Sequence, residues 1–152
     1  MKKYEFTGET KRVELWNRTA TLHRIKATVE FGFVKVGELG GWIEKEENLS
    51  HEGKAWVCGD AKVCGDAEVW GNAEVFLASH VLVMGSVGSR NDFTTFFRDK
   101  DNEITVKCGC FLGKIDKFLE KVTQTHGNNK YALVYRAAVE VAKLQIELTE
   151  RK

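Results

Sequence analysis

The side chains best suited to chemistry gather in one short segment, residues 85–92, which reads GSVGSRND. Its glycines allow the backbone to approach a ligand closely, and its serines offer hydroxyl groups. Arg90 adds a planar fork of hydrogen-bond donors that matches a phosphate or a carboxylate. We therefore predict a phosphate-binding loop with these ligand-binding residues: Ser86, Gly88, Ser89, Arg90, Asn91, Asp92 and, after the next strand, Arg98.

The same segment also fits a tight turn that binds nothing. The side chains of Asn91 and Asp92 then close the turn, and Arg90 pairs with Asp92 or with acidic residues of the preceding repeat. Both interpretations remain open. Strands are expected on either side, over residues 81–84, 93–97 and 104–111, with the turn residues RDKDNE between the last two.

Catalytic and metal-binding alternatives find less support. Each histidine fits a capping or surface role better than that of a general base: His23, His51, His80 and His126. Cys108 and Cys110 form a CxC rather than a CxxC pair, and their thiols would share one face of a strand. No nucleophile elbow, Walker loop, dinucleotide fingerprint or HExxH motif is found. We expect no enzyme activity, no catalytic residue, no cofactor and no metal site.

Upstream of the loop, residues 53–76 repeat a hexapeptide four times: GKAWVC, GDAKVC, GDAEVW and GNAEVF. In each unit an alanine and a valine stand two positions apart, so both side chains point to the same side of an extended strand. Glycine suits each corner, because it tolerates a positive φ. A glycine every six residues excludes an α-helix and is typical of a parallel β-helix. The valines that should point inward are Val57, Val63, Val69 and Val75.

The repeat resembles the hexapeptide motif of left-handed parallel β-helices, in which three hexapeptides form one triangular coil. The units and their flanks amount to little more than two coils, so neighbouring segments must cap the ends. Many hexapeptide proteins are acyltransferases, and the resemblance makes that activity an alternative. So short a prism offers little wall for coenzyme A, which places the acyltransferase last among the candidates.

The flanks complete the expected fold, which is mainly β with C-terminal α-helices. Residues 1–40 should form strands over 12–16, 21–29 and 31–36 that cap the repeat. Residues 41–82 should form a short parallel, left-handed β-helix. Residues 83–152 should form a β-hairpin and two helices, over about 115–125 and 130–150, separated by Gly127 as a C-cap.

The second of these helices is apolar on two sides. One side carries Tyr131, Val134, Tyr135, Ala138, Val141, Ala142, Gln145 and Leu148; the other carries Leu133, Val139, Leu144 and Ile146. A helix of this kind is buried on both sides. The pattern predicts a subunit interface and a homo-oligomer.

Composition narrows the environment and the partners. The net charge of +1 does not favour a general nucleic-acid binder. No apolar run approaches the roughly 20 residues that span a bilayer, and the first residues are polar, so we expect a cytoplasmic protein with reduced cysteines and no membrane contact. An acidic face could instead block a basic partner protein: Glu44, Glu46, Glu47, Asp60, Asp66, Glu68 and Glu74.

Taken whole, the chain resembles a family of small proteins encoded by phages and prophages of Gram-positive bacteria. The matching segments are MKKYEFTGETK, LHRIKA, VGELGGWIEKEENLSHEGKAWV, repeats of the GDAKV type, and the tail GSRNDFTTFF, CGCFLGKIDKF and THGNN. The resemblance implies a viral origin and this fold. It leads to the hypothesis of a counter-defence protein that sequesters a nucleotide immune signal through residues 85–92, or that blocks a host defence protein. A structural oligomerisation module is the alternative.

Overall fold

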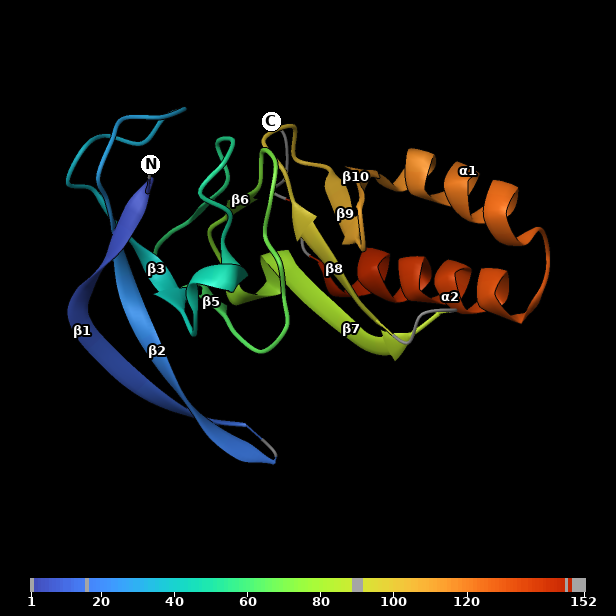
Figure 1. Cartoon of the computed structure of the whole chain (residues 1–152), viewed down its shortest axis with the longest axis horizontal. Coiled ribbons are helices and arrows are strands. Elements are labelled where there is room, and N and C mark those ends of the chain that lie inside the picture. Colours follow the sequence, from blue (N-terminus) through green and yellow to red (C-terminus); the bar gives the residue numbers. More distant parts are fainter. Residues whose placement is uncertain (1, 16, 89–91, 147, 149–152) are drawn as a thin grey trace.

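The computed structural model describes residues 2–15, 17–88, 92–146 and 148 of the chain. Within these residues the fold is mainly β with two helices at the C-terminal end, as expected. Figure 1 shows four parts in succession along the long axis: a hairpin arm, a stacked coil, a second sheet and the helices. The hairpin arm consists of β1 (Tyr4–Leu15) and β2 (Arg18–Ala27), which pair antiparallel, and β2 pairs in turn with β3 (Leu39–Ile43).

The stacked coil, residues 42–75, is built from short parallel pairings. β3 pairs with β5 (Lys62–Val63), β4 (Trp56–Val57) pairs with β6 (Glu74–Val75), and Leu49 forms a parallel bridge with Val69. Ile43 thus lies beside Val63, and Val57 beside Val75, so the chain returns to the same side after 20 or 18 residues. Three hexapeptides, or 18 residues, complete one turn of the coil. Valines three units apart in the sequence therefore stack on each other, as Val57 and Val75 do.

The inward orientation of the repeat is confirmed. Val57, Val63, Val69 and Val75 are each at most 1% exposed, and the alanines two positions before them are also buried. The glycines at the corners all have positive φ, between 61° and 71°: Gly53, Gly59, Gly65 and Gly71. The sequence period therefore identifies both the inward positions and the corners correctly.

Asn48, fully buried, joins the two turns of the coil. Its Oδ1 accepts hydrogen bonds from the backbone N–H groups of Glu44 and Lys45 at 3.1 and 3.0 Å. Its Nδ2 donates to the carbonyl oxygens of Gly65 and Ala67 at 3.1 and 2.9 Å. One side chain thus satisfies four backbone groups at a corner where the strand ladder is interrupted.

The end of the coil near the N-terminus is covered by the start of β1. Tyr4 is buried in the coil core and donates a hydrogen bond to the carbonyl oxygen of Leu49 at 2.7 Å. His51 stacks on the Tyr4 ring at 4.0 Å. Lys3 donates to the carbonyl oxygen of Ala55 at 2.7 Å, and burial lowers the pKa of its ammonium to about 8. The N-terminal residues therefore act as a lid on the apolar interior.

The other end of the coil is covered by the second sheet, which has the order β10-β9-β8-β7. Its strands are β7 (Val81–Val87), β8 (Asp92–Arg98), β9 (Ile104–Cys108) and β10 (Phe111–Lys114). Phe97 of β8 belongs to the core of the coil, whereas its neighbour Phe96 belongs to the core beneath the helices α1 (Ile115–His126) and α2 (Lys130–Gln145). Alternate residues of a strand point to opposite faces, so this sheet separates two cores.

Four expected elements differ from the structure. The first strand, expected over residues 12–16, begins at Tyr4 because the whole N-terminal segment pairs with β2. Residues 31–36 form a turn closed by a Phe31–Val34 bridge, with Gly32 at φ +52°, and not a strand. Residues 104–111 form two strands, because the chain reverses at Gly109 (φ +59°) and pairs Cys108 with Phe111. The last helix ends at Gln145, where Ile146 becomes extended and is buried in the core under the helices.

Replacing Asn48 by alanine should destabilise the fold by about 3 kcal/mol, because the N–H of Lys45 and the carbonyl oxygens of Gly65 and Ala67 lose the hydrogen bonds that Asn48 makes, whereas the N–H of Glu44 keeps the carbonyl oxygen of Val63. The measurement is the free energy of unfolding in urea. Asn72→Ala is the matched control, since Asn72 is an asparagine of the same coil whose position, at the Gly71-Asn72 corner, is exposed. Equal losses in the two variants would contradict the role given to Asn48.

Glu44 should make the fold sensitive to acid. Its carboxylate accepts two hydrogen bonds from Arg18 and one from the N–H of Gly65, which lower its pKa from 4.5 to about 2. A lowered folded-state pKa means that the stabilisation is complete above pH 4.5 and is lost as the pH falls to about 2. Wild type should melt at a higher temperature than Glu44→Gln near neutral pH, and this gap should close between pH 4.5 and 2. Glu47→Gln, at an exposed position, should show no such closing gap.

Candidate functional site

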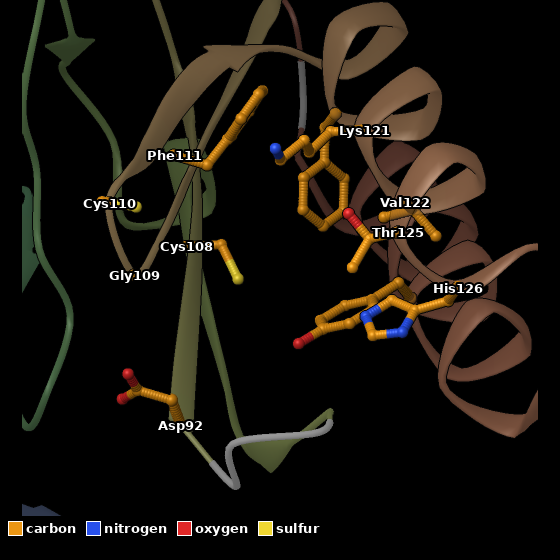
Figure 2. Close-up of a pocket in the computed structure, with 11 residues that line it drawn as sticks. Asp92, Cys108, Gly109, Cys110, Phe111, Lys121, Val122, Thr125 and His126 are labelled. Atoms are coloured by element: carbon orange, nitrogen blue, oxygen red, sulfur yellow. The ribbon is translucent and has the colours of Figure 1, made fainter.

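A pocket with a cavity volume of about 160 Å³ lies where the second sheet meets the helices. Its walls come from the start of β8, the β9–β10 turn, one face of α1 and one residue of α2, as Figure 2 shows. The lining residues are Asp92, Cys108, Gly109, Cys110, Phe111, Phe118, Lys121, Val122, Thr125, His126 and Tyr135. We call it the β8–α1 pocket.

Aromatic rings form most of its inner wall. Phe118 packs against Phe111 with 5.5 Å between ring centroids and against Tyr135 edge-on at 5.6 Å. His126 stacks on Tyr135 at 6.0 Å with an angle of 25° between the rings. These contacts fix the rings in place before any ligand arrives, and a flat apolar wall of this kind suits an aromatic or aliphatic group.

The polar groups of the pocket lie at its rim. The ammonium group of Lys121 extends across the pocket toward Phe111 (Figure 2), and no carboxylate of the described residues pairs with it. Thr125 and Asp92 are exposed, and the Asp92 carboxylate accepts a hydrogen bond from the N–H of Phe93 at 2.8 Å. Thr94 donates a hydrogen bond to the Cys108 sulfur at 3.3 Å. The rim thus offers one unpaired cation, one carboxylate, a hydroxyl and an imidazole.

The predicted loop borders this pocket. Asp92 lines it, and Gly88 lies directly behind Tyr135. Ser86 belongs to β7, but the structure does not describe its side chain. Ser89, Arg90 and Asn91 lie outside the described residues, so their predicted role stays a prediction.

Gly88 and Tyr135 are in direct contact. A Cβ atom at Gly88 would lie 1.8 Å from the hydroxyl oxygen of Tyr135, and Gly88 has φ +80°. Only glycine permits this conformation and this approach together. The glycine of the predicted loop therefore sets how closely the end of β7 approaches α2, and with it the position of a pocket wall.

Arg98 is not brought to the pocket. It stands at the opposite end of β8 from Asp92 and is only 8% exposed. Its guanidinium donates to the carbonyl oxygen of Glu74 and to Oδ1 of Asn102, both at 3.0 Å, and lies over the Phe76 ring. It thus fastens the second sheet to the coil.

Sequence reasoning missed several residues of the pocket. Cys108, Cys110 and Phe111 come from the CGCF segment, and Thr125 and His126 from the THGNN segment. These segments and GSRND stand out in the sequence separately, and the fold brings residues of all three to one pocket. The pocket was missed because the spacing of these segments in the sequence does not indicate that they lie together in the fold.

The other histidines have structural positions. His80 accepts hydrogen bonds at Nδ1 from the N–H groups of Phe76 and Leu77. His23 stacks on Phe6 at 4.4 Å. Within the described part of the chain, no three His, Cys, Asp or Glu side chains are grouped as a metal ion would require. No described helix is both long and apolar enough to cross a membrane.

No protein-family model matches the sequence, and no curated protein is significantly similar to it. The fold itself defines the architecture: a stacked coil that carries a two-sided sheet with two helices.

Gly88→Ala should destabilise the protein by about 3 kcal/mol or more, because the new methyl group must displace Tyr135 and also adopt a left-handed conformation. Gly65→Ala is the control for the conformational cost alone, since Gly65 has φ +65° and no atom within 4 Å of the added Cβ. That control should lose about 1 kcal/mol. Urea unfolding of the two variants measures the difference, and similar values would refute the proposed contact.

Proposed function

We propose that the protein is a non-enzymatic binding protein that holds a small phosphate-bearing ligand of the nucleotide type at the β8–α1 pocket. One observation carries this proposal: Gly88 and Asp92 of the loop, the CGCF turn and His126 meet around one aromatic cavity. A small apolar cavity with a few polar groups around it has the usual composition of a small-molecule site.

The size of the cavity determines which part of the ligand enters it. A cavity of about 150 Å³ accommodates a benzene molecule, and complete ligand sites are usually larger than about 300 Å³. The β8–α1 pocket, at about 160 Å³, therefore takes one ring system and not a whole nucleotide. The base enters between Phe111 and the His126–Tyr135 stack, and the sugar and phosphate remain at the rim.

The rim offers partners for those outer groups. Lys121 supplies a cation for the phosphate, and the Asp92 carboxylate accepts hydrogen bonds from sugar hydroxyls. Arg90 adds a bidentate phosphate contact, as the sequence of the loop predicts. Sequestration requires tight binding but no chemical step, so rings that hold the base and charged or hydrogen-bonding groups that hold the rest of the ligand are sufficient.

The biological setting follows from the phage resemblance. In the cytoplasm of an infected bacterium, a protein of this kind would remove a nucleotide immune signal, such as a cyclic oligonucleotide or an ADP-ribose derivative, and so act in counter-defence. The stacked coil, as a short left-handed parallel β-helix, would serve as an inert spacer between the hairpin arm and the binding end.

Blocking of a basic host defence protein by the acidic face is the less favoured form of this function. Most of its carboxylates already have partners in the chain: Glu44 with Arg18, Glu46 with Lys2, Asp66 with Lys45, Glu68 with Lys107 and Glu74 with Arg98. A neutralised face attracts a basic partner weakly. The alternative of a structural oligomerisation module gains support from the exposed apolar side of α2, and the acyltransferase alternative remains last.

Isothermal titration with cyclic oligonucleotides, ADP-ribose and mononucleotides tests the ligand-binding proposal. We expect at least one of them to bind, and Lys121→Ala to weaken that binding about ten- to hundredfold through loss of a charge-assisted contact. Arg90→Ala should weaken it as well. Lys117→Ala is the matched control, because Lys117 lies one turn earlier on α1 and pairs with Glu120 at 3.3 Å.

The outcomes separate the two functions. Binding that Lys121→Ala weakens and Lys117→Ala does not supports the β8–α1 pocket. The ligand proposal would be overturned if no compound of the panel binds, or if Lys121→Ala and Arg90→Ala bind as tightly as wild type. The structural oligomerisation module would then be the remaining function.

A further inference from the structure

Helix α2 has a second apolar side that the chain does not cover. The side that faces the sheet and α1 is formed by Ala132, Tyr135, Ala138, Val139 and Ala142. On the opposite side lie Leu133, Val141 and Leu144, and Leu144 is 88% exposed. At about 100° per residue, the centres of the two sides are roughly 170° apart around the helix. The sequence pattern predicted two apolar sides, but the structure assigns Val139 and Ile146 to the core and leaves Tyr131 and Val141 outside.

The exposed residues form a continuous row. Leu133, Ala137, Val141 and Leu144 follow one another at intervals of four, four and three residues, and we call them the outer stripe. These intervals add up to 11 residues in three helical turns, so the four side chains stay on one side of the helix, where they can pack against a second helix. An isolated exposed leucine needs no explanation, whereas a whole seam of them indicates an interaction surface.

Apart from Lys130 in the first turn of α2, charges border the outer stripe on one edge only. Arg136, Glu140 and Lys143 lie along this edge, and Val134 and Gln145 lie along the other. The Arg136 guanidinium donates to Thr123 Oγ1 and to the oxygens of Gly127 and Asn128, all neutral groups. Within the described chain, no carboxylate compensates its charge. Glu140 pairs with Lys143 at 3.5 Å, but both side chains are exposed, and an exposed pair of this kind contributes little and can be exchanged for a pair across an interface.

We propose that the outer stripe binds the outer stripe of a second copy of this chain, with the two α2 helices antiparallel about a twofold axis. The stripe is nearly symmetric about the middle of the helix. Reversal of the helix direction therefore places Leu133 on the partner's Leu144, and Ala137 on the partner's Val141. Each of these contacts occurs twice, as twofold symmetry requires.

The charged edge selects the antiparallel arrangement. When two helices run antiparallel, equivalent edges face each other, so Arg136 comes close to the partner's Glu140 and Glu140 to the partner's Arg136. In a parallel pair the charged edge would face the partner's uncharged edge, and these ion pairs could not form. The charged edge of the outer stripe is thus complementary to the same edge of a second copy, which identifies the partner as another molecule of this chain.

The surface beside the stripe can receive the partner. Leu119 of α1 joins Arg136, Ala137, Val139 and Glu140 of α2 in lining an open groove of about 390 Å³. This groove follows the charged edge, so the partner's side chains on that edge have space against α1. The interface therefore extends beyond a single pair of helices.

Sedimentation equilibrium of the full chain, over a wide range of concentration, tests the proposal. Wild type should be a dimer. Leu144→Glu should raise the dimer dissociation constant by about a hundredfold or more, because two buried leucines are lost per dimer. Val36→Glu is the matched control, since Val36 is 65% exposed at the far end of the molecule. Circular dichroism should show that both variants keep their fold.

A second variant tests the direction of the helices. Glu140→Lys makes the charged edge of the outer stripe entirely positive, and in an antiparallel dimer this edge faces the same edge of the partner. The dimer dissociation constant should therefore rise about threefold to tenfold, and more at low salt. Glu52→Lys, at an exposed position of the coil, should leave the dimer unchanged. A monomeric or trimeric wild type, or a dimer that resists Leu144→Glu, would overturn the proposal. A dimer that Leu144→Glu breaks but Glu140→Lys does not affect would overturn the antiparallel arrangement.

Discussion

The need to cover two apolar ends governs this structure. The stacked coil has only two turns, so each inward valine has a neighbour on one side and would otherwise meet water on the other. Tyr4 and Lys3 cover one end, and Phe97 with the rest of β8 covers the other. Asn48 holds the turns together at the corner where ladder hydrogen bonds are missing. The two lids are thus as necessary as the repeat.

The second sheet covers the end of the stacked coil with one face and supports the two helices with the other. Phe97 points into the coil and Phe96 into the core beneath the helices, so each strand fixes both sets of contacts at once. The polar contacts on the coil side, such as Arg98 with Glu74 and Lys107 with Glu68, keep the sheet in register on the coil. The β8–α1 pocket lies at the end of β8 away from Arg98, where the loop, the β9–β10 turn and α1 come together.

Local features of the fold could be predicted from the sequence, because they depend on neighbours in the chain. The hexapeptide period identified the buried valines and the corner glycines, and the apolar pattern of residues 115–125 matched α1. The turn at Gly109 was missed, since ITVKCGCF has the composition of a continuous strand and its reversal depends on pairing across the sheet. Likewise, the grouping of Lys121, His126 and Tyr135 with Asp92 depends on how α1 and α2 dock, which no local pattern encodes. Arg98 shares the charge expected of a ligand contact, but the pleat and length of β8 carry it to the coil.

Each full turn of the coil is an exchangeable unit. Val57 and Val75 occupy equivalent places 18 residues apart, and the segments between them differ little in sequence. Duplication or deletion of three hexapeptides would change the distance between the hairpin arm and the helices in steps of one strand spacing, about 4.8 Å, with both lids intact. The reach of the molecule can therefore evolve by simple gain or loss of repeats, independently of the surfaces at its two ends.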